Sequence, residues 1–161
     1  MTQQQLAKLE PPRIEQRKEL LIAGIDARYK CDDKAGIPSQ WQRFLPYLGH
    51  VPDQVNNVAY GVVHNVDDAG NMEYLCGVEV RDFSNATPEL ETLRIAPQRY
   101  AIFKHREHIS TIGDTFAAIW GQWLPKSGHQ AAAAPTLEVY GPEFDAQTGQ
   151  GGLEVWIPIE N

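Results

Sequence analysis

Thr136-Leu137-Glu138-Val139-Tyr140 and Leu153-Glu154-Val155-Trp156-Ile157-Pro158-Ile159 are the two stretches that best predict the fold of this chain. In both, apolar residues alternate with other residues at a period of two, which is typical of a strand with one buried face. On the other face we expect Thr136, Glu138 and Tyr140 from the first stretch, and Glu154 and Trp156 from the second. A carboxylate among aromatic rings suits the binding of a cation or an apolar amine, or acid/base chemistry on a bound molecule.

The composition indicates a globular protein without a nucleic-acid-binding surface. The 161 residues include 14 Lys and Arg against 21 Asp and Glu, a formal charge of -7, whereas phosphate binding normally requires a basic surface. This balance mildly favours cationic or neutral ligands. The two cysteines, Cys31 and Cys76, form no CxxC pair and no histidine pair has metal-ligand spacing, so we expect no disulfide, metal or cofactor. The sequence also has no signal peptide and no membrane-spanning run, so we expect a cytoplasmic protein.

The first half of the chain predicts a strand, a helix and a hairpin. Residues 1–12 are interpreted as a polar tail, because a Gln-rich start and two prolines offer nothing to bury. The apolar run 20–29 predicts a central strand. Ser39 and Gln42 resemble a capping box that opens a helix, and Pro46 is expected to kink this helix or to end its regular part. The runs 58–64 and 72–80, separated by an Asp- and Gly-containing turn, predict a hairpin.

The second half repeats this order of elements. The stretch 93–105 predicts a strand with an edge or bulge at Pro97, and a helix beginning near Thr111 carries apolar residues at helical spacing up to Pro125 and Gly128. Two further strands follow. We therefore predict an α+β fold, a tandem βαββ duplication with pseudo-twofold symmetry whose halves span about 13–83 and 92–160. Such units form one largely antiparallel sheet with the helices on one side and a central cleft.

Three segments in the C-terminal part of the sequence resemble a known protein family. The helix end Ile119-Trp120-Gly121-Gln122-Trp123-Leu124-Pro125-Lys126-Ser127-Gly128, the strand 135–140 and the terminal strand 154–159 together resemble the GyrI-like effector-binding domain, over roughly residues 13–160. This domain is also the C-terminal ligand-binding module of bacterial multidrug-responsive transcription regulators. The resemblance implies a pocket for hydrophobic cations in which Glu138 pairs with the positive charge, while Trp156 and Trp120 form aromatic walls. The sequence departs from those regulators in one respect: nothing before residue 13 resembles a helix-turn-helix, so we expect a standalone member without direct DNA binding.

Other aromatic residues are further candidates for ligand contact, through ring faces or phenolic hydroxyls. They are Tyr29, Tyr60, Trp41 and Phe116. The histidines are expected to face solvent, and no serine lies in a nucleophile elbow.

Several functions remain open. A cytoplasmic receptor for amphipathic, often cationic compounds is the leading hypothesis. A small hydrolase of electrophilic molecules would use Glu138 as general base, but no nucleophile or oxyanion donor accompanies it. Modulation of DNA gyrase, contact with a regulator and a homodimer through an exposed edge strand are further hypotheses.

Overall fold

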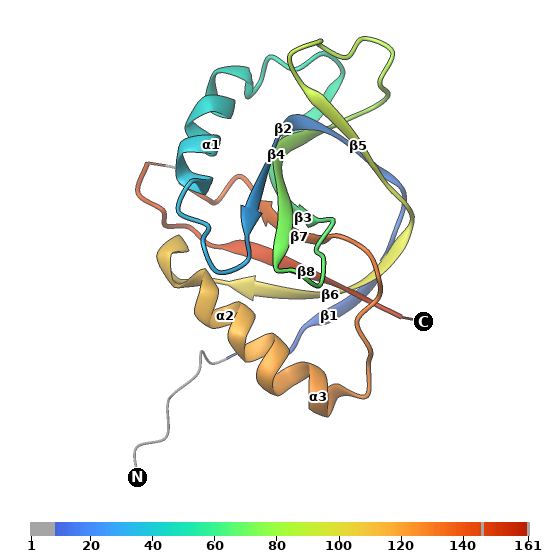
Figure 1. Cartoon of the computed structure of the whole chain (residues 1–161), viewed down its shortest axis with the longest axis vertical. Helices are drawn as coiled ribbons and strands as arrows, with labels where there is room; N and C mark the ends of the chain where they lie inside the picture. Colours follow the sequence, from blue (N-terminus) through green and yellow to red (C-terminus); the bar gives the residue numbers. More distant parts are fainter. Residues whose placement is uncertain (1–8, 146, 161) are drawn as a thin grey trace.

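One curled antiparallel sheet with helices on a single face makes up the fold (Figure 1). The computed structural model describes residues 9–145 and 147–160. Its strands are β1 (Arg13–Arg17), β2 (Leu20–Lys30), β3 (Gln54–His64), β4 (Asn71–Val80), β5 (Glu91–Ile95), β6 (Gln98–His105), β7 (Thr136–Tyr140) and β8 (Leu153–Ile159). Its helical segments are α1 (Ile37–Phe44), η1 (Leu45–Tyr47), η2 (Ile109–Thr111), α2 (Ile112–Ala118), η3 (Ile119–Trp123) and α3 (Leu124–Ser127).

The order of the strands shows the predicted pseudo-twofold symmetry. The sheet runs β1-β6-β8-β7-β3-β4-β2-β5, and exchanging β2, β3, β4 and β5 for β6, β7, β8 and β1 reverses this list onto itself. The central pair is β3 with β7, antiparallel, with Gly61 opposite Glu138. The two repeated units therefore meet at β3 and β7, and we call this pair the junction.

The outermost strands are exchanged between the two halves. β1 pairs with β6, and β5 pairs with β2, although only two residues separate β1 from β2 and β5 from β6. Both connections cross from one end of the sheet to the other, opposite the helices (Figure 1). Because the chain can bridge these ends with so few residues, the sheet must curl.

The two faces of the curled sheet have separate cores. Alternate strand residues point to opposite faces; the concave face buries a cluster made by strands alone, which includes Tyr60, Leu137, Tyr100 and Trp156. On the other face α1 packs over β2 and β4, and α2 packs over β6 and β8. Phe44 and Ile119, both fully buried, fix the two helices to the sheet.

Most elements agree with the sequence predictions, and the differences have local causes. The predicted hairpin and the helix end at Gly128, which is left-handed with φ 80°, are confirmed. The capping box is wrong, because α1 begins at Ile37 after Gly36, with Pro38 in its first turn. The predicted strand 93–105 is two strands, β5 and β6. The chain turns at Pro97, because β5 pairs with β2 at the other end of the sheet. Residues 1–8 of the predicted tail lie outside the described residues.

Candidate functional site

Glu138 lies at the junction, on the face that carries the helices. It sits in the middle of β7, where Leu137 and Val139 point into the concave core and the glutamate points the other way. The predicted orientation of Glu138 relative to its neighbours is confirmed. Because β7 is hydrogen-bonded to β3 on one side and to β8 on the other, the backbone beneath this carboxylate is held by two ladders.

Two tyrosine hydroxyls hold one oxygen of this carboxylate. Tyr74 donates to Glu138 Oε1 at 2.7 Å and Tyr140 donates to the same atom at 2.6 Å. The indole Nε1 of Trp41 in turn donates to the Tyr74 hydroxyl at 3.1 Å. Hydrogen bonds to a carboxylate are roughly twice as strong as those between neutral groups. They fix the side chain of Glu138 in one orientation.

These contacts change the acidity of both phenols. Burial, reinforced by the negative charge of Glu138, holds the pKa of Tyr74 and the pKa of Tyr140 well above the usual value. Both tyrosines are therefore protonated donors at neutral pH. The second oxygen of Glu138, Oε2, accepts no hydrogen bond from any described residue, and it is not enclosed by protein atoms.

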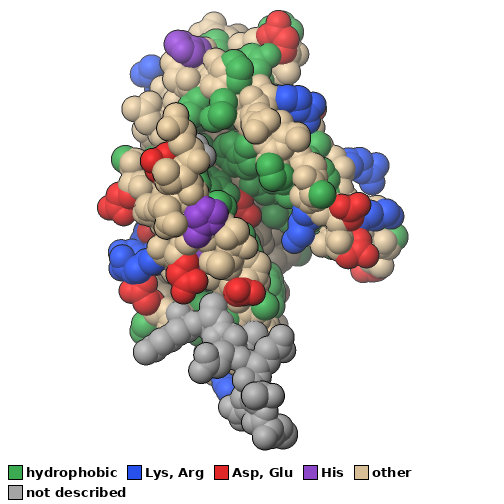
Figure 2. All heavy atoms as spheres, turned by 90° about the vertical axis from the view of Figure 1, so that its left-hand side faces the viewer, with side chains coloured by type: hydrophobic (Ala, Val, Ile, Leu, Met, Phe, Trp, Pro, Cys, Tyr) green, Lys and Arg blue, Asp and Glu red, His purple; other side chains and the backbone are tan. Residues whose placement is uncertain are grey.

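A cavity of about 260 Å³ lies in front of Glu138, between the start of α1 and the helix formed by α2 and η3. Figure 2 shows this face of the molecule, hollowed and lined mainly by hydrophobic side chains. Apart from the glutamate, residues from both halves contribute to the lining: Cys31, Lys34, Ile37, Val63, Val66, Met72, Tyr74, Phe116, Trp120 and Thr136. The cavity thus combines an apolar wall with one carboxylate, an arrangement suited to a ligand with an apolar body and a polar or charged group.

A π-helical turn positions the aromatic wall contributed by the second half. α2 continues directly into η3, which is a π-helix, and then into α3. Phe116 and Trp120, four residues apart, both line the cavity, while the intervening Ile119 is fully buried against the sheet. Trp120 is 42% exposed. Single π turns are frequent at functional sites, and this one leaves a large aromatic ring beside the cavity and free of the core.

The other candidate residues lie elsewhere. The prediction that Trp156 shares the face of Glu138 is wrong, because Trp156 is the cross-strand partner of Leu137 and lies in the concave core. Tyr60 pairs with Val139 and lies in the same core. Trp41 is not among the lining residues, and its ring centroid lies 5.2 Å from that of Tyr140 in an edge-to-face contact. Tyr29 donates its hydroxyl to Gln40 at 2.7 Å and does not line the cavity.

Tyr74, which contacts Glu138 directly, is one of the lining residues that the sequence predictions missed. One available signal was Gly61, since a glycine inside a strand often marks the close approach of another group. A Cβ at Gly61 would overlap the Tyr74 hydroxyl and would lie 2.7 Å from Glu138 Oε1. The glycine therefore leaves room for the hydrogen bond between the tyrosine and the glutamate.

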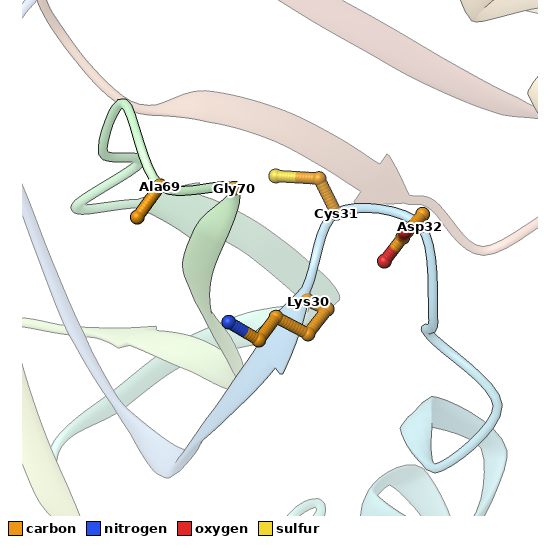
Figure 3. Close-up of a pocket in the computed structure, with 5 residues that line it drawn as sticks. All are labelled: Lys30, Cys31, Asp32, Ala69 and Gly70. Carbon is orange, nitrogen blue, oxygen red and sulfur yellow. The ribbon is translucent and has the colours of Figure 1, made fainter.

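A second hollow, larger at about 490 Å³, lies on the surface next to the cavity. It is formed by Lys30, Cys31 and Asp32 at the end of β2, and by Ala69 and Gly70 in the turn before β4 (Figure 3). The Cys31 thiol points toward that turn (Figure 3). Because two turns form this hollow and none of its described lining residues is aromatic, the smaller cavity at Glu138 is the stronger candidate site.

Two histidines are not solvent-facing, contrary to expectation. His105 is 3% exposed, with Nδ1 2.7 Å from the Thr115 hydroxyl of α2. His64 Nε2 lies 3.0 Å from Asp26 Oδ1 and 3.8 Å from Glu73 Oε2, on the concave face. Burial, followed by the neighbouring Glu73 carboxyl group, raises the pKa of Asp26, while the contact with His64 opposes this rise. The pKa of Glu73 is lowered, mainly by its hydrogen bond with Asp26.

Fold and cavity together define a domain that binds small molecules. The chain belongs to the GyrI-like small molecule binding domain family, which matches residues 10–160. The family assignment confirms the resemblance carried by the C-terminal helix and strands. Within residues 9–145 and 147–160, none of the helices combines the length and apolar character needed to cross a bilayer.

Individual relatives extend this assignment. The transcriptional regulator BrlR of Pseudomonas aeruginosa is 25% identical over 125 residues, which are 76% of this chain and 46% of that protein. The chain thus spans about half the length of this relative. SAV2435, in a structure bound to tetraphenylphosphonium, superposes with a TM-score of 0.75 at 17% identity, covering 94% of this chain and 95% of that one. The C-terminal domain of EcmrR superposes with a TM-score of 0.67 at 14% identity, covering 95% of this chain and 98% of that one. At these identities the two structures establish the shared fold.

Proposed function

We propose that this protein is a cytoplasmic receptor for amphipathic organic cations, and that the cations bind in the cavity at the junction with Glu138 as their counter-charge. One observation carries the proposal. One carboxylate oxygen is held by two tyrosine hydroxyls, while the other has no hydrogen-bond donor among the described residues and lies beside an apolar, aromatic cavity. An organic cation supplies the missing positive charge and covers the apolar wall at the same time.

The charges around the cavity favour a cation over an anion. Within the described part of the chain, no Lys or Arg nitrogen lies within 4.0 Å of the Glu138 carboxylate. Of the described residues that line the cavity, Lys34 alone is basic. It is exposed in the connection before α1, where its flexible side chain can extend into solvent. The protein as a whole carries a net charge of -7, which attracts cations at long range.

The aromatic residues add a second source of cation affinity. Trp120 is the most exposed ring of the lining, and a tryptophan face attracts a cation by about 0.5–2 kcal/mol. Tetraphenylphosphonium, the ligand bound to SAV2435, has the required chemistry, a single positive charge enclosed by four phenyl rings. It is therefore a suitable first probe for this chain.

The test compares a cationic and a neutral probe on matched variants. Isothermal titration calorimetry measures the affinity of tetraphenylphosphonium, and of uncharged triphenylphosphine oxide, for the wild type and for the variants Glu138→Gln and Glu89→Gln. Glu89 is exposed in the connection before β5, so its variant makes the same charge change away from the cavity. We expect Glu138→Gln to weaken the phosphonium by roughly 10- to 100-fold, in line with a charge pair in a partly desolvated site, and to leave the neutral probe nearly unchanged.

Two results would contradict the proposal. One is equal phosphonium affinity in the wild type and Glu138→Gln, and the other is an equal loss in Glu89→Gln, which would indicate only long-range attraction.

Hydrolysis with Glu138 as general base remains a prediction that depends on the same free oxygen. Incubation with activated esters and strained-ring electrophiles tests it, since turnover abolished by Glu138→Gln and retained by Glu89→Gln would favour an enzyme. Contact with gyrase or a regulator and a homodimer also remain predictions.

A further inference from the structure

Three side chains of metal-ligand type converge on the concave face, away from the cavity. Asp26 comes from β2, His64 from the end of β3 and Glu73 from β4. His64 and Glu73 are direct cross-strand partners. Asp26 is opposite Leu75, which lies two residues after Glu73 on β4, so its side chain is on the same face of the sheet as that of Glu73. Because three hydrogen-bonded strands carry them, their relative positions are fixed by the sheet and not by flexible loops.

The donor atoms are close enough to share one ion. His64 Nε2 is 3.0 Å from Asp26 Oδ1 and 3.8 Å from Glu73 Oε2, and the three donor atoms all lie within 4.8 Å of one another. Ligands bound at about 2.0–2.2 Å to a tetrahedral or octahedral ion lie roughly 3.0–3.5 Å apart. Small side-chain rotations therefore bring all three atoms to a common centre.

The charges of the cluster favour a divalent cation. Two carboxyl groups adjoin one imidazole, and the exposed fractions of the Asp26, His64 and Glu73 side chains are 12%, 9% and 25%. Among the residues that the structure describes, no Lys or Arg nitrogen approaches either carboxylate within 4.0 Å; Arg28, the cross-strand partner of Glu73, is exposed. Two half-buried carboxylates repel each other, and an ion of charge +2 neutralises both.

We propose that Asp26, His64 and Glu73 form a binding site for a divalent transition-metal ion such as Zn²⁺ or Mn²⁺. One imidazole nitrogen with two carboxylate oxygens is a donor set suited to these ions, whereas Ca²⁺ and Mg²⁺ prefer oxygen ligands alone. Asn65 donates to Glu73 Oε1 at 3.1 Å and so directs Oε2 toward the histidine, as partners of metal ligands commonly do. Three protein ligands leave at least one coordination position for water.

The proposed metal site and the cavity lie on opposite faces of the same strands. Val63 and Met72 line the cavity, and each precedes a proposed ligand, His64 and Glu73. Successive strand residues point to opposite faces, so the sheet separates the two sites. The metal proposal is therefore independent of the proposed receptor function, and it is tested without any organic ligand.

The test measures metal binding directly. The exposed thiol of Cys31 is first removed by Cys31→Ser, so that it does not bind the ions. In this background, calorimetry with Zn²⁺ and visible absorption with Co²⁺ compare the parent with His64→Gln, Asp26→Asn and, as a control, His50→Gln, which changes an exposed histidine outside the cluster. Circular dichroism verifies that each variant is folded.

The expected result is one ion per chain, with a d–d absorption band for Co²⁺ and a rise in melting temperature with Zn²⁺. His64→Gln and Asp26→Asn should each weaken binding by roughly 100-fold or more, exceeding the 10- to 100-fold cost of losing an outer partner such as Asn65, and His50→Gln should leave binding unchanged. The proposal is overturned if the parent binds no ion, or if folded His64→Gln and Asp26→Asn both bind as tightly as the parent. An equal loss in His50→Gln would also overturn it, by locating the ion elsewhere.

Discussion

Replacing Gly61 by alanine tests whether the tyrosine–glutamate contact depends on the room left by this glycine. The added methyl group would overlap the Tyr74 hydroxyl and lie 2.7 Å from Glu138 Oε1. Tyr74 is 1% exposed, so its ring cannot move aside without disturbing the packing against α1. We therefore expect the methyl group to displace the hydroxyl from the carboxylate.

The size of the effect follows from two destabilising contributions and one that opposes them. Overpacking a buried site costs about 1–3 kcal/mol, and a hydrogen bond to a charged group contributes about 1.5–3 kcal/mol. Alanine also lowers the backbone entropy of the unfolded chain, which stabilises the folded state by about 0.4–1 kcal/mol and offsets part of this cost. The free energy of unfolding should thus fall by about 3–4 kcal/mol, and the melting temperature by roughly 10 °C for a chain of this size.

Urea denaturation measures the change, with Gly113→Ala as the matched control. Gly113 lies in α2, and nothing is within 4 Å of the position of its added Cβ, so alanine there should stabilise the helix by about 0.5–1 kcal/mol. In a double-mutant cycle, Gly61→Ala should cost less in a Tyr74→Phe background, because the overlapping hydroxyl is absent. If Gly61→Ala unfolds at the same urea concentration as the wild type, or if Tyr74→Phe recovers nothing, the reasoning about this contact is refuted.

Two other perturbations address the exposed tryptophan and the buried phenols. Trp120→Ala should weaken tetraphenylphosphonium by roughly 3- to 30-fold, with the free energy of unfolding changed by only about 0.5 kcal/mol because the residue is 42% exposed; unchanged affinity by calorimetry would exclude Trp120 from the site. Burial raises the pKa of Tyr60 and the pKa of Tyr100 from 10.0 to about 12. The folded state therefore retains protons that the unfolded chain has lost, so stability is fully present below pH 10 and falls as the pH rises toward 12. Urea titrations at alkaline pH should show a shallower fall in the Tyr60→Phe and Tyr100→Phe variants, and an equal slope would contradict the assignment.

Local patterns predicted the elements whose two faces differ in polarity. In β7 the alternation of Leu137 and Val139 with Thr136, Glu138 and Tyr140 assigns each residue to a face, and the structure agrees. In β8 the residues from Val155 to Ile159 are buried on both faces, so the period of two carries no information about which face Trp156 occupies. Only the pairing of Trp156 with Leu137 determines it, and that pairing depends on residues distant in sequence. Tyr60 lies in the buried segment 59–62 of β3. It was predicted as a ligand contact, but it lies in the concave core for the same reason.

Only part of the candidate site could be predicted from the sequence. Phe116 and Trp120 were predicted as ligand contacts from the helix and the family resemblance, and they do line the cavity. The contacts between residues of different halves could not be predicted. Tyr74 and Glu138 are separated by 64 positions, and no motif joins them. Asp26, His64 and Glu73 are likewise brought together only by the register of three strands, without the short ligand spacing that characterises metal motifs.

The exchange of β1 and β5 between the two halves has a consequence for protein engineering. A chain cut in the exposed connection between β4 and β5 would yield two fragments, and each would lack an edge strand that the other supplies. Three β-ladders, β1 with β6, β2 with β5 and β3 with β7, would join them. Neither fragment should fold alone, yet the two should reassemble when mixed, with the residues of the cavity divided between them. Such a split pair offers a reporter in which a bound small molecule strengthens the association of two polypeptides.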